Sequence, residues 1–482
     1  MALARRIAYN VVFNSIAKIA STVLALVAIG FITRYLGKEG FGDYATVLAF
    51  FSLFSSLADL GLSTLLAREI SRKDAPEPTI IGNVLALRLG TSASVFLIAL
   101  VFIPFLPYGS DLRLGIALAA ASFLVASSSG ILNGIFQKRL IMFQVAAIEL
   151  TGKVLQLGII ILAVFFDWGF IAIVSALFAS LFWNAISVYI FARRAISFHL
   201  SFDVSFWKSF LRESAPIGLI SIVTFTYFKM DTIFLSVLQG SADVGIYNAA
   251  YKIIENLTFF PAMIAGLVLP LFSRYILQEP EKFRIVADKT FKVFVAFAAP
   301  LSIGGFFLAE DLARLIGGSE FVESAAPLRF LIFALGAIFF GNFFNAILIA
   351  GNKQKYLLIV LSGVALINIA ANLVLIPQFS YMAAAFTSLG TESLVAFATA
   401  FLASKLLGYR PSFEGIIGIL FSAFLMGSIL FFFQNLPFPL LLLFGIVSYL
   451  LSLSLTGSIT KNELELLFSR SSSSKEASLL EN

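Results

Sequence analysis

Charged side chains that fall inside long apolar stretches are the residues of this sequence most able to do chemistry. Six are cations and five are acids: Lys18, Arg88, Lys153, Lys229, Lys252 and Arg329, with Asp59, Glu149, Asp231, Glu255 and Glu392. If these stretches cross a membrane, an ionisable group at bilayer depth costs on the order of several kcal/mol unless it is paired or faces water. Eleven such groups therefore predict a hydrated cavity, mutual neutralisation, or both.

Two pairs of these charges have partners on their own helix. Glu149 and Lys153 are four residues apart, and Lys252 and Glu255 are three apart, so each pair lies on one helix face. A structural ion pair explains each of them at least as well as a function does. Arg88 and Glu392 have no such local partner, so a functional role and a contact with another helix stay equally open.

The residue types indicate binding and transport of ions more than catalysis. Lysine binds phosphate as a point charge, and arginine can bind it bidentately. The acids would suit coupling to protons or sodium ions. No cofactor or metal site is predicted, because the chain has no cysteine and its single histidine is His199. There is no catalytic constellation or nucleotide motif, so we expect a protein that is not an enzyme.

Membrane-spanning helices are the elements that must hold these charges. The chain is 60% hydrophobic and only 12% charged over 482 residues, whereas a soluble domain has about 25% charged residues. Stretches of about 20 apolar residues cross a bilayer as helices. We predict an all-α polytopic membrane protein with fourteen spans: 9–33, 44–66, 79–104, 112–136, 140–165, 168–191, 214–238, 245–270, 290–309, 325–349, 355–376, 381–404, 414–434 and 437–458.

The basic residues predict how these spans are oriented. If the N-terminus is cytoplasmic, one alternate set of loops receives most of the 33 Lys and Arg residues. The opposite loops hold Arg34, Lys38, Arg113 and Arg314. This asymmetry places both termini in the cytoplasm of a multi-pass cell membrane protein. The net charge of +6 then comes from the basic cytoplasmic loops that orient the spans. Nucleic acid is therefore not predicted as a partner.

Two sequence echoes divide the spans into halves. The loops after the first and seventh spans share a Gly-Gly-Tyr pattern, 203 residues apart: Gly37, Gly42 and Tyr44 with Gly240, Gly245 and Tyr247. A Gly-x-x-Gln-Lys pattern also repeats six spans apart, at 134–138 and 351–355. Repetition of this kind is typical of two-lobed transporters, with parallel repeats and a substrate path between the lobes.

The resulting organisation has five parts. We predict an N-lobe (1–195), a cytoplasmic amphipathic linker (196–213), a C-lobe (214–405), an appendage of two further spans (406–460) and a disordered tail (461–482). The linker mixes aromatic and basic residues, and we expect it to lie flat on the membrane surface with its aromatic side down. Each lobe would contain six helices. Because six is an even number, both halves would enter the membrane from the same side.

Charge concentrates on the first two helices of each lobe. The residues concerned are Lys18, Asp59, Lys229, Asp231, Lys252 and Glu255. We therefore expect these helices to face one another across a central cavity. Polar side chains would add hydrogen-bonding groups to its walls: Asn10, Asn14, Tyr227 and Asn248.

Short motifs along spans 1–12 resemble a known transporter family. They are RYLGKEGFGDY at 34–44, ADLGL at 58–62, Arg68-Glu69, SAPIG at 214–218, Lys229-Met-Asp231, VGIYNAA at 244–250 and LPLFSR at 269–274. In this order they resemble the Wzx-type oligosaccharide-lipid flippases of the multidrug/oligosaccharidyl-lipid/polysaccharide superfamily. The final two spans agree with that family mainly by their number.

The resemblance implies a MATE-like fold of two bundles, a V-shaped cavity and alternating access. It implies a polyprenyl-(pyro)phosphate-linked oligosaccharide as substrate, with membrane lipids, polysaccharide polymerase and glycosyltransferases as partners. It assigns Lys18, Arg88, Lys229 and Lys252 to the substrate headgroup. It leaves Asp59, Asp231, Glu255 and Glu392 as candidates for ion coupling or gating.

Alternatives stay open within and beyond this superfamily. A cation-coupled multidrug exporter would use acids as its coupling site, although such exporters usually have twelve spans. A flippase for lipid-linked peptidoglycan precursors would have several arginines in its cavity, whereas the walls here are mostly lysine with nearly balancing acids. A membrane scaffold that transports nothing would not need so many charges at depth.

Overall fold

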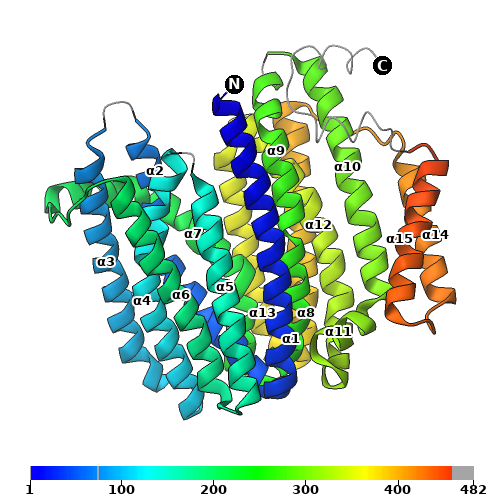
Figure 1. Cartoon of the computed structure of the whole chain (residues 1–482). Helices are drawn as coiled ribbons and strands as arrows, with labels where there is room; N and C mark the ends of the chain where they lie inside the picture. The colour runs from blue at the N-terminus through cyan, green and yellow to red at the C-terminus, as the bar shows by residue number, and fades with distance from the viewer. Residues whose placement is uncertain (1, 73–74, 140, 277, 459–482) are drawn as a thin grey trace. The chain divides into compact units, whose positions relative to one another are not determined.

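The computed structural model describes residues 2–72, 75–139, 141–276 and 278–458, and every regular element within them is a helix (Figure 1). The predicted all-α class is confirmed. The described residues group into two compact units. The first contains the residues up to Asn248 together with Ile316–Glu320, and the second contains the remainder.

The first unit holds seven helices, a short 3-10 turn and the beginning of an eighth helix. Their bounds are α1 (Ala2–Asp59), α2 (Leu62–Ile70), α3 (Glu77–Phe102), η1 (Ile103–Phe105), α4 (Ser110–Lys138), α5 (Met142–Phe165), α6 (Gly169–Ala195), α7 (Val204–Leu238) and α8 (Ser241–Leu257). The second unit continues with α9 (Phe259–Tyr275), α10 (Pro280–Phe307), α11 (Ala309–Gly317), η2 (Ser319–Ser324), α12 (Ala325–Ala350), α13 (Gln354–Leu407), α14 (Ile416–Phe432) and α15 (Phe438–Leu455).

Ten helical segments in the described part of the chain are long and apolar enough to cross a membrane. Two of them, Ile16–Asp59 with 44 residues and Gln354–Leu407 with 54, far exceed the roughly 20 residues that one crossing needs. Each contains a non-helical residue, Gly37 or Ser380, where the sequence predicts a loop between two spans. Each predicted span overlaps a helix, and the count of fourteen crossings stays a prediction.

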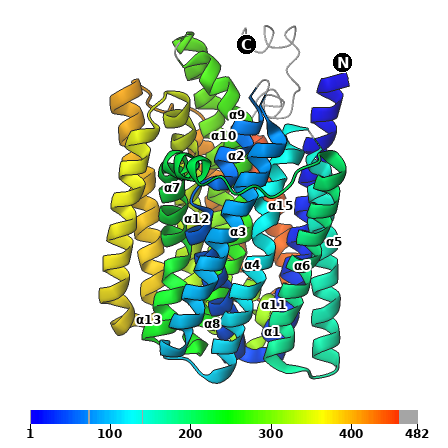
Figure 2. The same ribbon diagram turned by 90° about the vertical axis from the view of Figure 1, so that its left-hand side faces the viewer.

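Gly37 reverses the direction of α1. Its φ of 65° and ψ of −170° lie in a region that glycine adopts readily. Figures 1 and 2 show the chain running away from its N-terminus and then returning to α2, at the end of the first unit where the N-terminus lies. The part of α1 before Gly37 is called its first arm below, and the part after Gly37 its second arm.

A second break, after Asp59, corrects the predicted span 44–66. The helix stops where Leu60 and Gly61 adopt positive φ values of 46° and 77°, and α2 begins beyond them. A Cβ at Gly61 would lie 2.6 Å from the Ser214 carbonyl oxygen, and a Cβ at Gly218 would lie 2.6 Å from Leu60 Cα. The break therefore lets the backbones of α1 and α7 approach more closely than side chains would allow.

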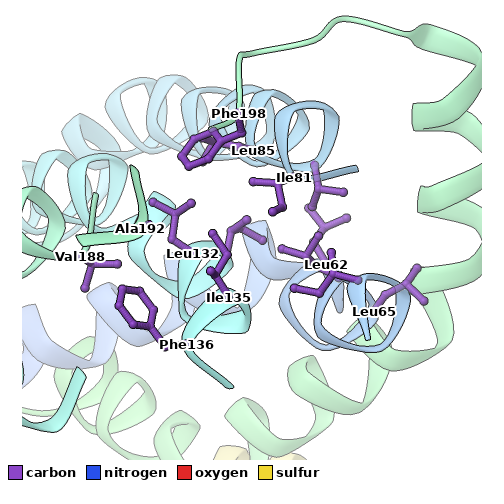
Figure 3. Packing of buried hydrophobic residues seen from close by; sticks show 14 of the residues in the cluster. Leu62, Leu65, Ile81, Leu85, Leu132, Ile135, Phe136, Val188, Ala192 and Phe198 are labelled. Carbon is purple, nitrogen blue, oxygen red and sulfur yellow. The ribbon is translucent and has the colours of Figure 1, made fainter. Parts of the chain in front are cut away.

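A hydrophobic core fixes α2 against α3, α4 and α6 at this end of the first unit (Figure 3). Its buried side chains come from all four helices and from the linker after α6, and they include Leu62, Leu65, Ile81, Leu85, Leu132, Ile135, Phe136, Val188, Ala192 and Phe198. Burying one large apolar side chain stabilises a fold by about 1.5–3 kcal/mol. The core therefore gives the short helix α2 a defined position.

The predicted linker 196–213, whose second half forms the first turns of α7, is attached to this core by part of its aromatic side chains. Phe198 and Phe210 are buried in the core, although we expected the aromatic face to lie on the membrane surface. Asn83 of α3 accepts a hydrogen bond at Oδ1 from the Asp203 backbone N–H at 2.9 Å. The Asn83 carbonyl accepts another from Trp207 Nε1 at 3.0 Å. Protein contacts therefore hold this face in place.

Replacing Gly82 with alanine is expected to lower the free energy of unfolding by about 1–3 kcal/mol, the usual range for overpacking. A Cβ at Gly82 would overlap the His199 carbonyl oxygen of the linker, so the linker must shift. Chemical unfolding in detergent would measure the change. Gly90→Ala is the matched control in α3, because a Cβ there meets nothing within 4 Å. Equal stability of the two variants would contradict the prediction.

In the second unit, the last two helices attach along α10. The Tyr449 hydroxyl donates a hydrogen bond to the Ala296 carbonyl at 2.8 Å. Met426 and Leu430 of α14 are buried with Leu441 of α15 in a common cluster. The five-part division expected from the sequence stays a prediction, and the predicted tail 461–482 lies outside the described residues.

Candidate functional site

An ion pair between Asp59 and Arg88 joins the second arm of α1 to α3. Asp59 Oδ1 lies 3.2 Å from Arg88 Nη1, and Ser63 Oγ donates a hydrogen bond to the same carboxylate oxygen at 2.7 Å. Arg88 is only 4% exposed, so the carboxylate compensates a buried charge. The sequence contains no local partner for Arg88, and the predicted roles of these two residues are separate. The structure brings them together.

Arg88 is also held by α4. Its Nε donates a hydrogen bond to the Ser127 carbonyl at 3.4 Å, and its guanidinium carbon lies 5.5 Å from the centre of the Phe123 ring. A cation–π contact of this kind contributes about 0.5–2 kcal/mol. Contacts from α3 to two other helices suit a residue that positions α1 and α4 against α3.

A second buried acid lies between α7 and the start of α8. Asp231 is 3% exposed and accepts a hydrogen bond from the Tyr247 hydroxyl at 3.0 Å. One residue further along each helix, Thr232 Oγ1 donates to Asn248 Oδ1 at 3.1 Å. Two side-chain hydrogen bonds thus join α7 to α8 at the repeated tyrosine. This enclosure makes Asp231 a candidate for linking proton binding to a movement between the two helices.

The predicted headgroup lysines of the first unit differ in exposure. Lys18, on the first arm of α1, is exposed, whereas Lys229, on α7, is partly buried. Among the predicted polar wall residues, Asn248 is buried at 3% exposure. The side chains of Asn10, Asn14 and Tyr227 lie outside the described part of the structure.

A row of polar side chains along α5 makes more contacts than the single ion pair that the sequence predicts. Glu149 interacts electrostatically with Lys18 of α1 and with Lys153. Lys153 Nζ donates a hydrogen bond to Gln156 Oε1 at 3.1 Å, and Tyr44 forms a side-chain hydrogen bond with Gln156. The row therefore touches both arms of α1. The 149-153-156 spacing places these side chains on one helix face, whereas the sequence prediction covers only the Glu149–Lys153 pair.

The two repeated loops contact each other through their glycines. A Cβ at Gly42 would come closer than 3.0 Å to the Ser241 carbonyl oxygen, and a Cβ at Gly245 would come closer than 3.0 Å to that of Lys38. Lys38 and Ser241 are equivalent positions of the repeat, as are Gly42 and Gly245. The contact is therefore reciprocal, and it needs both glycines. We call it the glycine junction.

Hydrogen bonds reinforce this region of the first unit. Ser241 Oγ donates to Asp43 Oδ1 at 2.6 Å. The Ile316 carbonyl, near the end of α11, accepts bonds from Thr33 Oγ1 at 2.8 Å and from Arg34 Nη1 at 3.0 Å. A cation near a helix C-terminus is favourable because it interacts with the helix dipole. Besides the glycine junction, hydrogen bonds therefore hold residues on both sides of Gly37.

The second unit contains the remaining predicted site residues. Lys252 Nζ lies 2.6 Å from Glu255 Oε2, which is the ion pair that their spacing indicates. Glu392 is 9% exposed and follows the buried Thr391 on α13. Thr391 Oγ1 accepts a hydrogen bond from Asn368 Nδ2 at 3.5 Å, across the break at Ser380. Glu392 therefore adjoins a buried polar group that joins the two parts of α13.

Similarity to known proteins covers most of the chain. Residues 7–276 match the family model described as "Polysaccharide biosynthesis protein", and residues 216–374 match the model described as "MatE". A protein of Shigella flexneri named "Putative O-antigen transporter" is 24% identical over 355 residues. That alignment covers 70% of this chain and 82% of the relative.

Two solved structures share the fold at low sequence identity. A lipid II flippase, MurJ, in an inward closed conformation has a TM-score of 0.76 at 14% identity, covering 92% of this chain and 98% of its own. An inward-facing multidrug resistance MATE family transporter has a TM-score of 0.64 at 15% identity, covering 80% and 94% respectively. These similarities show the fold, and they support the predicted MATE-like class.

Proposed function

We propose that this chain, which belongs to the polysaccharide biosynthesis protein family of the multidrug/oligosaccharidyl-lipid/polysaccharide superfamily, moves a lipid-linked oligosaccharide across the cell membrane. The substrate would be a polyprenyl-(pyro)phosphate carrying several sugars. It would pass from the cytoplasmic to the outer leaflet for the assembly of a surface polysaccharide. The name of the Shigella flexneri relative supports this substrate class.

Ionisable side chains within the apolar helices of the first unit carry the proposal. Lys18, Lys229 and Asp231 all lie within intervals predicted to cross the membrane. A pyrophosphate cannot cross hydrocarbon unaided, because desolvating even one ion costs on the order of several kcal/mol. Cations at this depth would lower that cost, while the polyprenyl tail stays in lipid.

The residues would divide into three roles. Lys18 and Lys229 of the first unit would contact the phosphate-sugar headgroup, and Lys252 of the second unit stays a separate candidate for this role. Asp231, with Glu255 and Glu392, would be the candidates for coupling to protons or sodium ions. The paired Asp59 and Arg88 would position the helices, since Arg88 is buried against α1 and α4.

Alternating access would need the glycine junction to open and close. With both termini in the cytoplasm, the repeated loops lie on the outer side of the membrane. The contact of Gly42 with Ser241 then holds the second arm of α1 against α8 on that side. Release of the headgroup outside would follow the separation of these two elements.

A transport assay tests the proposal directly. The protein is reconstituted in vesicles with a fluorescent polyprenyl-pyrophosphate sugar, and translocation is followed for the wild type and for Lys18→Ala with Lys229→Ala. Each lost charge-assisted contact is worth about 1.5–3 kcal/mol, so we expect at least a roughly tenfold slower rate at low substrate concentration. Lys355→Ala, which removes an exposed lysine in the first turn of α13, is the matched control.

Two outcomes would count against this function or its site. If the wild type translocates no lipid-linked sugar, the flippase function fails. If translocation is normal but the lysine variant matches the Lys355→Ala control, the headgroup assignment fails while the function stands.

A second candidate is a cation-coupled multidrug exporter. The MatE family match over residues 216–374 favours it. Such a protein would expel cationic dyes in exchange for protons and would leave the lipid-linked sugar in place. A third candidate, a flippase for lipid-linked peptidoglycan precursors, shares the MurJ fold at only 14% identity. Translocation of a lipid-linked peptidoglycan precursor in preference to a lipid-linked oligosaccharide would favour this third candidate.

A further inference from the structure

The segment 196–213, which includes the connection after α6 and the first turns of α7, exposes both apolar and basic side chains. Leu200, Phe202 and Val204 are 49%, 70% and 57% exposed, and Lys208 and Arg212 are exposed as well. Positions 204, 208 and 212 are four residues apart on α7, so they share one helix face. We call these five residues the linker surface.

The linker surface is fixed in its outward direction by contacts on the opposite side. Phe210, on the same helix, is 5% exposed and belongs to the core of the first unit. The bonds from Asp203 and Trp207 to Asn83 hold the chain on both sides of Val204. Turning the linker surface inward would break these contacts. Its exposure is therefore a stable property of the fold.

The linker surface lies at one end of the long helices of the first unit, where we infer the boundary between membrane and water. Figures 1 and 2 show the first part of α7 running across the long helices of the first unit, near α2. α7 contains Pro216, and proline within a helix is a usual cause of a bend. The loops at this end carry most of the basic residues, which indicates the cytoplasmic side.

The nearby acids leave an excess of positive charge, because Glu213 is paired with Arg68 and Asp203 alone stands against Lys208 and Arg212. Asp203 caps α7 by accepting hydrogen bonds from the backbone N–H groups of Ser205 and Phe206 at 2.9 and 3.1 Å. Glu213 forms an ion pair with Arg68. Lys208 and Arg212 are thus left as the charge that the linker surface offers.

We propose that the linker surface binds the anionic headgroup layer of the cytoplasmic leaflet. Leu200, Phe202 and Val204 enter the boundary between headgroups and acyl chains, and Lys208 and Arg212 contact lipid phosphates. The bound face is the one opposite the buried Phe198 and Phe210, and of the aromatic residues expected on the membrane it keeps Phe202. Because α7 also carries Lys229 and Asp231, the lipid composition of this leaflet acts on a helix of the candidate site.

Site-directed spin labelling of the full-length protein tests this proposal. The chain has no cysteine, so a label on Phe202→Cys attaches at one position. In nanodiscs containing phosphatidylglycerol, we expect the label to be reached by oxygen in the lipid and protected from a water-soluble nickel complex. In phosphatidylcholine alone, this preference should fall. Each basic residue contributes about fivefold to binding of an anionic surface, so Lys208→Gln with Arg212→Gln should weaken the preference by roughly 25-fold.

A label on Ser197→Cys, an exposed polar position of the linker, serves as the water-exposed control. If the label at 202 behaves like this control in both lipids, the membrane does not bind the linker surface. If the label at 202 is buried in lipid equally in both kinds of nanodisc, and Lys208→Gln with Arg212→Gln does not change this, the requirement for anionic lipid is overturned. The readout does not depend on transport, so it stands apart from the proposed substrate.

Discussion

Replacing Asp59 with asparagine is expected to lower the free energy of unfolding by about 3–5 kcal/mol, because it leaves a buried charge without compensation. Arg88 is 4% exposed, and the Asp59 carboxylate lies 3.2 Å from its guanidinium. The reverse change, Arg88→Gln, should cost less, since the Asp59 side chain is 21% exposed and water can solvate it. Denaturant unfolding of the purified protein measures both changes.

The double variant Asp59→Asn with Arg88→Gln supplies the control. Residues that interact directly depart from additivity by about 0.5–3 kcal/mol, so the double variant should be more stable than the sum of the single changes predicts. Additive losses would show that the pair does not interact. Transport adds a second test: if Arg88 binds the headgroup, Arg88→Gln stops transport while Asp59→Asn with intact Arg88 retains it in every folded molecule.

Replacing Gly42 or Gly245 with alanine is expected to open the glycine junction. Each added Cβ would overlap a backbone carbonyl of the other repeated loop, and backbone cannot move aside as a flexible side chain can. Overpacking of this kind costs about 1–3 kcal/mol, which lowers the closed population by roughly 5- to 150-fold. Transport would then fail in the conformational cycle, with the fold retained.

A cysteine at Thr46 can report this opening. Thr46 is 1% exposed and bonds to the Gly42 carbonyl, so an impermeant maleimide should label Thr46→Cys slowly in the native protein. Labelling should speed up with Gly42→Ala or Gly245→Ala. Gly240→Ala is the matched control in the same loop, because nothing lies within 4 Å of its added Cβ. Slow labelling in all three variants would show that the glycines do not control this closure.

Apolar patterning was sufficient to locate the helices but not to locate all of their breaks. The loop around Gly37 was expected, because polar and glycine residues interrupt the hydrophobic run there. The break after Asp59 was missed, since Leu60 and Leu62 continue an apolar pattern. That break depends on the close approach of Gly61 to Ser214 of α7. A contact between residues so distant in sequence leaves no local signal.

The same limit applies to the candidate site. The Lys252–Glu255 pair could be read from its spacing, because helix geometry alone places those side chains together. The Asp59–Arg88 pair joins two helices, and their packing decides which charges meet. The repeated loops are an intermediate case: their likeness indicated equivalent places, while the reciprocal contact of Gly42 and Gly245 required the fold.

The glycine junction also bears on how such a chain can arise. Gly42 contacts Ser241, which is the repeat equivalent of Lys38, and Gly245 contacts Lys38 itself. When residue i of one copy meets j of the other, and j meets i, the contact is that of a two-fold symmetric homodimer. A half-length ancestor with one such loop could pair with its own copy through both contacts at once. Gene duplication and fusion would then have joined two surfaces that already fitted each other.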